Sequence, residues 1–436
     1  MNSPVDAPVA PTPIDPTPRA VQPQVVEPAA PALGDSFVGR KYVQLVLVLG
    51  ALSAIGPLTI DTYLPALPAL TADLAATPAA AQLTISGLLA GLGLGQLVAG
   101  PLSDTFGRRR PLLVGLVGHG LMSILCALAP SVEVLTLTRV LQGLFAAAVA
   151  VTAMAVVRDL FSGNKAAQLL SRLILVLGVA PILAPSLGSG LLTLTSWRGI
   201  FVVLAVIAVL LVVLAVYALP ETLPVQRRFA ARPAQSLRAY GTLFRDGIFV
   251  TMVLVAGFMF AAMFAYVAGS PFILQGIYGL SPQQFGLAFG LNAVGLIASS
   301  QFNPVLVRRY GAPRVMTAAV TGGFASALVL ATLALTGVGG ILGFMIPLWF
   351  VIAACGLSFP NAPAIALNRH GDSAGTAAAM LGSAQFLIGG LSAPIVGALA
   401  DGTAFPMAAV MVAATGISAA LLWSKRQQLI DSVPPE

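Results

Sequence analysis

Charged side chains are scarce in this sequence. They make up 8% of the 436 residues, whereas hydrophobic residues make up 58%. Soluble globular domains carry charge on roughly a quarter of their residues. This shortage excludes an ordinary soluble protein and indicates a chain that lies mostly within a lipid bilayer.

Cysteine and histidine are also rare, with two of each. Cys126 and Cys355 are far apart and fall in apolar stretches, so neither a disulfide framework nor a cysteine metal site is expected. The two histidines, His119 and His370, cannot form a His-Glu-x-x-His metal site, and the chain has no Gly-x4-Gly-Lys-Ser/Thr phosphate loop. We therefore expect no catalytic residues, no metal site and no cofactor, and direct use of ATP is unsupported.

Long apolar runs take the place of the missing charge. A membrane-spanning helix needs about 20 mostly apolar residues, and the chain has room for about twelve such helices. The predicted spans are 42–68, 80–101, 111–129, 132–157, 167–192, 198–219, 246–274, 283–306, 313–335, 340–364, 377–399 and 404–424. The expected fold class is an all-α membrane protein with twelve transmembrane helices.

The start of the chain has a different composition. Residues 1–36 are rich in Pro, Val and Ala and show no helical periodicity, and the segment that they begin extends over residues 1–40. They also lack the basic start and apolar core of a secretory signal. We interpret this segment as a disordered cytoplasmic tail.

The basic residues predict the orientation of the helices, because short cytoplasmic loops are enriched in Arg and Lys. If the first span leaves the cytoplasm, the loops assigned to the inside contain Arg108, Arg109, Arg110, Arg158, Lys165, Arg227, Arg228, Arg232, Arg238, Arg245, Arg308, Arg309, Arg314 and Arg369. The opposite loops contain Asp73, Glu133 and Asp401, with Arg198 as their only basic residue. Both termini are thus expected in the cytoplasm, and the scattered arginines do not suit nucleic acid.

Two short motifs occur twice. "APSLG" at 184–188 recurs as "APIVG" at 393–397, and "FGRRRPLL", which begins at Phe106, is echoed by "YGAPRVM", which begins at Tyr310. Because six predicted spans separate the copies, both copies face the same way, as in transporters built from two similar bundles. Such bundles can rock about a central site, which indicates transport.

The repeat predicts the domain organisation. We expect an N-terminal six-helix bundle at 41–219, a basic cytoplasmic linker at 220–245, a C-terminal six-helix bundle at 246–425 and a cytoplasmic tail at 426–436.

The loop after the second predicted span carries a family motif. "GPLSDTFGRRRPL", which begins at Gly100, resembles the G-x-L-x-D-x-x-G-R-[RK]-x-x-L pattern of the major facilitator superfamily. Gly100 and Gly107 permit close helix approach and a tight turn. The resemblance implies a conformational gate in which Asp104 bonds Arg108, Arg109 or a helix end. Alternatively, the arginines only set the orientation. The echo in the second half has no acid in the place of Asp104.

The fifth predicted span carries a second motif. "LGVAPILAPSLGSG" at 177–190 resembles the fifth-span motif of the family's proton-coupled exporters, in the A-P-x-x-G form that resembles the bicyclomycin/chloramphenicol-resistance branch. In this motif Gly178, Pro181, Pro185 and Gly188 remove backbone bonds and bulk, which permits a bend where two bundles slide past each other. Simple helix packing is the alternative.

The same branch is suggested by "DTYLPALP" after the first span, by "LPETL" at 219–223 and by "FAYVAGSPFILQGIYGLSPQQFG" at 264–286. The resemblance covers residues 40–425 and implies a drug:proton antiporter, a multidrug efflux protein of the bacterial inner membrane. Such a protein exports amphipathic small molecules or antibiotics in exchange for protons, with the proton gradient as its energy source. We expect a monomer in the lipid bilayer.

One carboxyl group lies where lipid is expected. Asp61 follows an almost wholly apolar run, while the other acidic residues lie in tails or predicted loops. A proton-driven exporter needs a group that takes up a proton on one side and releases it on the other, and buried carboxylates are rare because they are costly. Asp61 is therefore the candidate for proton coupling. The alternative is that it lies at the outer membrane boundary and caps the turn at Pro65 and Pro68.

Arg139 lies about two turns inside the fourth predicted span, at a depth close to that of Asp61. Because a charge at this depth is costly without a partner, we expect Asp61 and Arg139 to interact. The alternative is that Arg139 bonds only Gln142 and backbone carbonyls as a fixed strut. His119 is expected to be a packing or hydrogen-bonding residue.

The substrate cavity is predicted from adaptable and polar side chains within the spans. Methionine and aromatic residues can receive varied apolar ligands, and polar residues need partners or cavity water. The candidates are Gln142, Met259, Met263, Phe264, Tyr266, Asn292, Asn361 and Gln385. Lipid contact is the alternative for the methionine and aromatic residues.

Other functions of the same fold stay open. A proton-linked metabolite or sugar transporter is the main alternative, because a fold does not determine function. A passive facilitator is a further alternative, and a membrane-embedded enzyme is less favoured. An enzyme would change its substrate chemically, whereas a transporter would return it unchanged.

Overall fold

The computed structural model describes residues 39–161, 163–228, 240–368 and 374–431. These residues form helices and contain no strand. The expectations for the N-terminal tail up to residue 38 and for Arg232, Arg238 and Arg369 lie outside the described residues.

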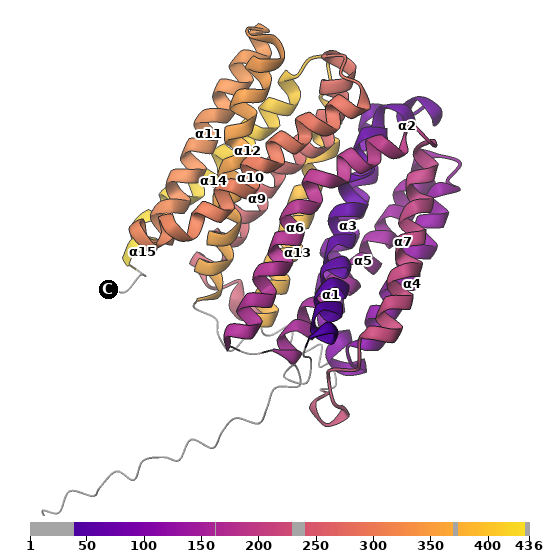
Figure 1. Cartoon of the computed structure of the whole chain (residues 1–436). Helices are drawn as coiled ribbons and strands as arrows, with labels where there is room; N and C mark the ends of the chain where they lie inside the picture. Colours follow the sequence, from indigo (N-terminus) through magenta and orange to yellow (C-terminus); the bar gives the residue numbers. More distant parts are fainter. Residues whose placement is uncertain (1–38, 162, 229–239, 369–373, 432–436) are drawn as a thin grey trace, which may run out of the picture.

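Six long helices form the N-terminal bundle (Figure 1). They are α1 (Arg40–Asp61), α3 (Pro78–Phe106), α4 (Arg109–Ala127), α5 (Val132–Leu160), α6 (Gly163–Leu191) and α7 (Trp197–Ala218). After α1 the chain continues through a short 3₁₀ segment, η2 (Leu64–Ala66), into α2 (Leu67–Asp73).

Six more long helices form the C-terminal bundle. They are α9 (Gly247–Pro271), α10 (Pro282–Tyr310), α11 (Ala312–Thr336), α12 (Gly340–Leu367), α13 (Ala374–Ala398) and α14 (Phe405–Ser424). A π-helical turn, η4 (Phe272–Ile277), extends α9. The short 3₁₀ segment η3 (Val225–Arg227) lies in the linker between the bundles, and α15 (Arg426–Asp431) begins the predicted C-terminal tail.

Hydropathy predicted these spans to within a few residues. In the described part of the chain, eleven helical segments are long and apolar enough to cross a membrane, and α6 adds a shorter apolar stretch, Val176–Leu191. The all-α membrane fold is thus confirmed. The first span differs from the prediction because its helix is interrupted after Asp61, where Pro65 and Pro68 lack the N–H groups that a continuous helix needs.

Capping side chains define where several helices begin. Thr77 accepts a hydrogen bond from the Ala80 N–H at the start of α3, and Pro78 occupies the first helical position. Ser281 and Gln284 form a reciprocal capping box at the start of α10. These local signals fix helix ends that lie at the membrane surfaces.

The internal repeat is visible in the turns as well as in the sequence. Gly107 ends α3 with φ of 85°, and Gly311 ends α10 with φ of 77°. Only glycine adopts such a conformation readily. The two echoed sequences therefore make the same kind of helix–turn–helix connection in the two bundles.

Within the N-terminal bundle, α3 packs directly on α5. A Cβ atom at Gly91 would overlap the carbonyl oxygen of Val140, and one at Gly143 would overlap that of Leu88. The absence of side chains at these glycines lets the two backbones touch.

The two bundles meet along two seams. In the first, α3 packs on α13, where the Ser86 hydroxyl donates to the Gly390 carbonyl at 2.6 Å. In the second, α6 packs on α10, where the Ser189 hydroxyl donates to the Pro282 carbonyl at 2.6 Å. Both contacts lie toward the same end of the molecule, at the start of α3 and the end of α6.

Candidate functional site

Asp61 is the last residue of α1 and lies within the membrane-length segment Arg40–Asp73, not at its end. Its side chain is 7% exposed and makes no hydrogen bond or ion pair with any described residue. It interacts electrostatically with Tyr266 of α9, in the other bundle. Asp61 is thus a buried, unpartnered carboxyl group at the boundary between the bundles, and it does not cap the turn at Pro65 and Pro68.

Arg139 of α5 is completely buried. Its Nη1 donates to the Thr59 carbonyl at 3.1 Å and to Gln142 Oε1 at 2.8 Å. The guanidinium also lies 4.8 Å from the centre of the Tyr63 ring and 5.5 Å from that of Phe201. Attraction to aromatic faces offsets part of the cost of burying this cation.

The expected pair between Asp61 and Arg139 does not form in this structure. Arg139 reaches the carbonyl of Thr59, so it lies at the expected depth. The Thr59 side chain contacts His119 of α4, and side chains two residues apart on a helix point about 200° apart, so Asp61 faces away from this side of α1, toward Tyr266 of α9. The sequence indicated the right depth but not the face. The alternative, in which Arg139 bonds Gln142 and a backbone carbonyl, describes the observed contacts.

A buried hydrogen-bond network surrounds Arg139. The Thr59 hydroxyl donates to the Ile55 carbonyl at 2.6 Å and therefore accepts from His119 Nε2 at 2.9 Å. Gln142 Nε2 donates to the Ser123 hydroxyl at 2.8 Å. The network joins α1, α4 and α5, and His119 takes the hydrogen-bonding role that was expected of it.

Near the turn from α3 to α4, Arg108 joins two helix ends. Its Nη1 donates to Asp104 at 2.6 Å and to the Ser103 hydroxyl at 2.8 Å, and its Nε donates to Asp159 at 2.7 Å. Burial lowers the pKa of Arg108, but the hydrogen bonds to Asp159 and Asp104 outweigh it and hold the pKa above its ordinary value. The expected bond between Asp104 and Arg108 is therefore present.

Glu221, at the start of the linker, caps the start of α4. Its carboxylate accepts the backbone N–H groups of Arg108 at 2.8 Å and Arg109 at 3.3 Å, and it pairs with Arg228 at 3.5 Å. Burial raises the pKa of Glu221, but these N–H groups outweigh it and hold the pKa below its usual value. A Cβ atom at Gly107 would overlap the carboxylate, so only glycine fits there.

We call Asp104, Arg108, Asp159 and Glu221 the charge cluster. Asp159 and Glu221 were not selected from the sequence, because they lie 51 and 113 residues from Arg108. A usable signal was present: acids are few in the loops assigned to the arginine-rich side, so each is a candidate partner for an arginine.

The other gate residues behave differently from the expectation. Arg109 does not bond Asp104, because its Nη2 donates to the Val216 carbonyl of α7 at 2.8 Å. Gly100 has no neighbour within 4 Å of the position that a Cβ atom would occupy, so no close helix approach occurs there.

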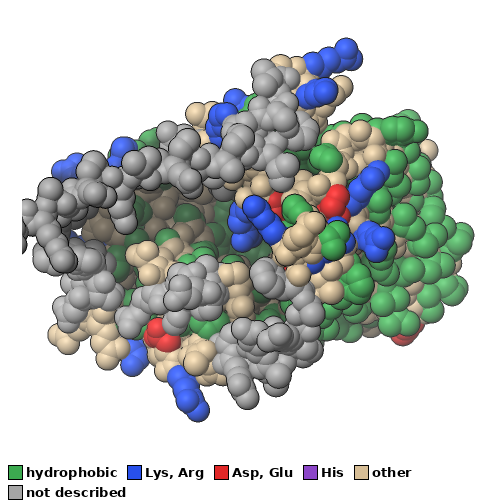
Figure 2. Space-filling model, turned by 90° about the horizontal axis from the view of Figure 1, so that it is seen from below, with side chains coloured by type: hydrophobic (Ala, Val, Ile, Leu, Met, Phe, Trp, Pro, Cys, Tyr) green, Lys and Arg blue, Asp and Glu red, His purple; other side chains and the backbone are tan. Residues whose placement is uncertain are grey.

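A cavity of about 600 Å³ opens between the bundles at the end of the molecule that carries the charge cluster. We call this end the basic face, and Figure 2 shows it hollowed between its basic side chains. The wall comes from α3, α5, α13 and the end of the linker, and includes Gln96, Asp104, Met154, Asp159, Tyr240 and Thr376. Its mixture of polar and apolar groups suits an amphipathic molecule.

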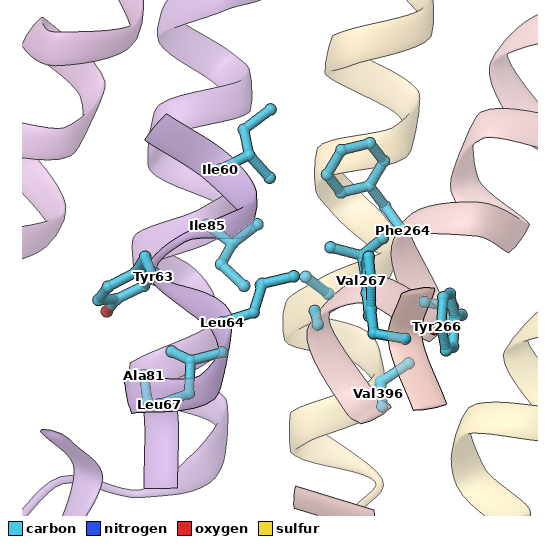
Figure 3. Close-up of a cluster of buried hydrophobic side chains, with 14 of the residues drawn as sticks. Ile60, Tyr63, Leu64, Leu67, Ala81, Ile85, Phe264, Tyr266, Val267 and Val396 are labelled. Atoms are coloured by element: carbon cyan, nitrogen blue, oxygen red, sulfur yellow. The ribbon is translucent and has the colours of Figure 1, made fainter. Parts of the chain in front are cut away.

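The opposite end is closed by an apolar cluster in which the bundles meet. Figure 3 shows Ile60, Leu64 and Leu67 facing residues of the C-terminal bundle, among them Phe264 and Val267. We call these five residues the apolar cluster. Asp61 follows Ile60 directly, so the carboxyl group lies at the edge of this closure.

None of the eight predicted cavity residues lines the open cavity. The six that are buried are Gln142, Met259, Phe264, Tyr266, Asn292 and Asn361. Polar members bond inside a bundle: Asn292 Nδ2 donates to the Tyr266 hydroxyl at 3.2 Å, and Asn361 Nδ2 donates to Asn303 at 2.7 Å. The amide groups of Asn292 and Asn361 thus find partners in other side chains. Met263 and Gln385 are partly exposed.

A group of aromatic side chains lies inside the C-terminal bundle. The Phe260 ring centre is 4.8 Å from that of Phe264, 5.6 Å from Phe359 and 5.3 Å from Phe386. Phe260, Phe359 and Phe386 are partly exposed. Because they come from α9, α12 and α13, no local sequence pattern could have grouped them.

The fifth-span motif lies on α6 between α1 and α10. A Cβ atom at Gly188 would overlap the Thr62 carbonyl, next to Asp61, and one at Gly178 would lie 3.4 Å from Ile297 of α10. Gly188 thus allows close packing, whereas a side chain at Gly178 would make only an ordinary contact. Pro181 and Pro185 lie within α6, which continues through both, and the bend expected from them stays a prediction.

Two six-helix bundles that enclose a cavity open at one membrane face define a membrane transporter of the alternating-access type. The model of the Major Facilitator Superfamily matches residues 47–394, so the chain belongs to this family. It is a transporter by family and not an enzyme.

The curated relatives agree with the branch indicated by the motifs. The chain is 36% identical over 379 residues to an uncharacterized MFS-type transporter, YdgK, of Bacillus subtilis (strain 168), covering 86% of this chain and 93% of the relative. It is 32% identical to a bicyclomycin resistance protein homolog of Haemophilus influenzae, covering 86% and 94%. It is 30% identical to a chloramphenicol resistance protein of Pseudomonas aeruginosa, covering 83% and 86%.

Solved structures show the same fold. A D-xylose-proton symporter aligns with a TM-score of 0.69 at 18% identity, covering 87% of this chain and 96% of that one. A mutant form of the nucleoside transporter NupG aligns with a TM-score of 0.68 at 14% identity, covering 89% and 99%.

Proposed function

We propose that this protein is a proton-coupled exporter of amphipathic small molecules in a bacterial inner membrane. Relatives named for bicyclomycin and chloramphenicol resistance support the substrate class. The mixed polar and apolar wall of the cavity supports it as well. The observation that carries the proposal is Asp61, a carboxyl group with no partner among the described residues at the boundary between the bundles.

The basic face is cytoplasmic in this proposal. The turns after α3 and α10 carry Arg108–Arg110, Arg308 and Arg309 at this face, and positive residues mark cytoplasmic loops. The N-terminus of α1 and the end of α14 lie there too, so both termini are cytoplasmic. The conformation described is then open to the cytoplasm and closed to the outside. We propose that the protein acts as a monomer.

Closure of the apolar cluster and the charge of Asp61 are coupled in this proposal. An unpaired carboxylate is costly away from water, so proton uptake by Asp61 and closure of the apolar cluster favour one another. When the outer end opens, water reaches Asp61, and a proton from outside can bind there. Return to the inward-open form delivers that proton to the cytoplasm as the next substrate molecule binds.

Arg139 supports this cycle from the opposite face of α1. Its bond to the Thr59 carbonyl holds the helix two residues before Asp61. We propose that the charge cluster is the gate, in which Gly107 sets the turn and Arg108 holds α3 and α5 together at the cavity mouth. Met263, Gln385 and the partly exposed phenylalanines lie outside the open cavity described, and we propose that they contact substrate in another conformation of the cycle.

Replacement of Asp61 by Asn tests the proposal. Purified wild type and Asp61→Asn are reconstituted in vesicles with an imposed pH gradient, and uphill movement of chloramphenicol is measured. We expect the variant to lose gradient-driven accumulation while it still exchanges labelled for unlabelled chloramphenicol. Asp401→Asn, at an exposed loop acid, is the matched control and should behave like wild type. Undiminished uphill transport by Asp61→Asn would remove Asp61 from the mechanism.

A further inference from the structure

A second concave site lies on the outer side of the N-terminal bundle. It is a groove of about 450 Å³ between α4 and α7, two helices that run side by side at the edge of the molecule (Figure 1). Every lining residue is aliphatic or glycine, among them Leu116, Val117 and Leu121 of α4 and Val206 and Val213 of α7. Such a surface offers no side-chain hydrogen-bond partner to a polar ligand.

The groove points toward a cluster of polar side chains at the basic face. Arg109 and Arg110 lie seven residues before Leu116 and Val117 on α4, so each shares a helix face with a groove residue about 10 Å away. On α7, Tyr217 lies one turn beyond Val213 on the groove face and is 86% exposed. The apolar groove therefore ends in cations and a phenol at the membrane surface.

The two arginines differ in their partners. The Arg109 side chain bonds the Val216 carbonyl and so ties α4 to α7 at the end of the groove. The exposed side chain of Arg110 has no ion pair or hydrogen bond with any described residue. At the other membrane face, by contrast, Arg198 pairs with Asp73. An uncompensated positive charge thus lies at only one end of the groove.

We propose that this groove binds one anionic phospholipid of the cytoplasmic leaflet. Its acyl chain lies between α4 and α7, and its phosphate contacts Arg110, with Tyr217 beside it. Apolar burial holds the chain, and the arginine selects an anionic head group. A phospholipid of this class brings a negative group to Arg110, whereas nothing in the structure indicates that a second copy of this chain would do so. The assignment of this lipid to the cytoplasmic leaflet rests on the proposed orientation of the protein. Lipid binding itself does not depend on transport.

Lipid retention measures this site directly. Wild type and variants are equilibrated in vesicles with equal amounts of phosphatidylglycerol and phosphatidylcholine, released into mild detergent and analysed by native mass spectrometry. Arg110→Gln removes the head-group contact, and Val206→Trp fills the groove from an exposed position. The matched controls are Arg314→Gln, at the equivalent turn of the C-terminal bundle, and Leu328→Trp, at an exposed position of α11.

We expect wild type to retain one lipid with about a fivefold preference for phosphatidylglycerol, the effect of one arginine near a charged surface. Arg110→Gln should retain both lipids equally, Val206→Trp should retain neither, and both controls should match wild type. An unchanged preference in Arg110→Gln, or unchanged retention in Val206→Trp, overturns the proposal. So does a disulfide-linked dimer of Leu121→Cys in the bilayer, because a second copy would then occupy the groove.

Discussion

Asp159 should stabilise the charge cluster more than Asp104 does, although only Asp104 belongs to the family motif. Both carboxylates bond Arg108, at 2.6 Å for Asp104 and 2.7 Å for Asp159. They differ in exposure: the Asp104 side chain is 53% exposed, that of Asp159 19% and that of Arg108 9%. Asp159→Asn and Asp104→Asn remove one charge each without a change of shape.

The expected costs follow from these exposures. An exposed ion pair contributes about 0.2–1 kcal/mol, because water screens it. Removal of one partner of a buried pair costs about 3–5 kcal/mol, because a buried charge is left uncompensated. Asp159 lies between these limits and nearer the second, so we expect Asp159→Asn to cost about 2 kcal/mol and Asp104→Asn about 0.5 kcal/mol.

A double-mutant cycle separates these pair energies from other effects. The free energy of unfolding is measured by denaturant titration in micelles for each Asp variant, alone and combined with Arg108→Gln. In the Arg108→Gln background both costs should shrink, because the partner is gone. Equal costs for the two variants, or a cost of Asp159→Asn that persists without Arg108, would refute the assignment of Asp159 as the main partner.

Three further predictions test other contacts. Gly188→Ala should lower stability by about 1–3 kcal/mol, because its Cβ overlaps the Thr62 carbonyl; Gly190→Ala on the same helix, with open space around it, should have no such cost in the same titration. Glu221→Gln should cost about 1 kcal/mol. The pKa of Glu221 in the folded state is lowered from 4.5. The cost of Glu221→Gln should therefore be constant above about pH 5 and vanish as the pH falls through the folded-state pKa. A cost that grows on acidification contradicts the capping role. A cysteine at Thr376 should react with a membrane-impermeant maleimide added from the basic face, whereas one at Met259 should not; the reverse pattern would place the cavity elsewhere.

The helices could be predicted from the sequence because burial in lipid imposes a length and a composition on each one. What hydropathy could not show is the interruption after Asp61, since Pro65 and Pro68 stop the helix without changing its apolar character. That interruption decides the local path of the chain at the candidate proton site.

The candidate site was predicted in part. Depth along a helix follows from counting residues, so Asp61 and Arg139 were placed at similar levels. The face that each presents depends on the rotation of one helix against another, which packing determines and a single sequence does not. Asp159 and Glu221 were not predicted because their bonds to Arg108 and Arg109 join segments that are distant in the chain.

The seam between α3 and α13 limits how this protein can change over evolutionary time. A side chain at Gly397 would run into the backbone of Ala79, whereas one at Gly382 would meet only the end of the flexible Gln96 side chain. Substitution of Gly397 is therefore disfavoured, whereas Leu391 on the same helix is 64% exposed and free to vary among apolar residues. Among homologous sequences, position 397 of α13 should therefore stay glycine, while the positions of α13 that face lipid should exchange one apolar residue for another.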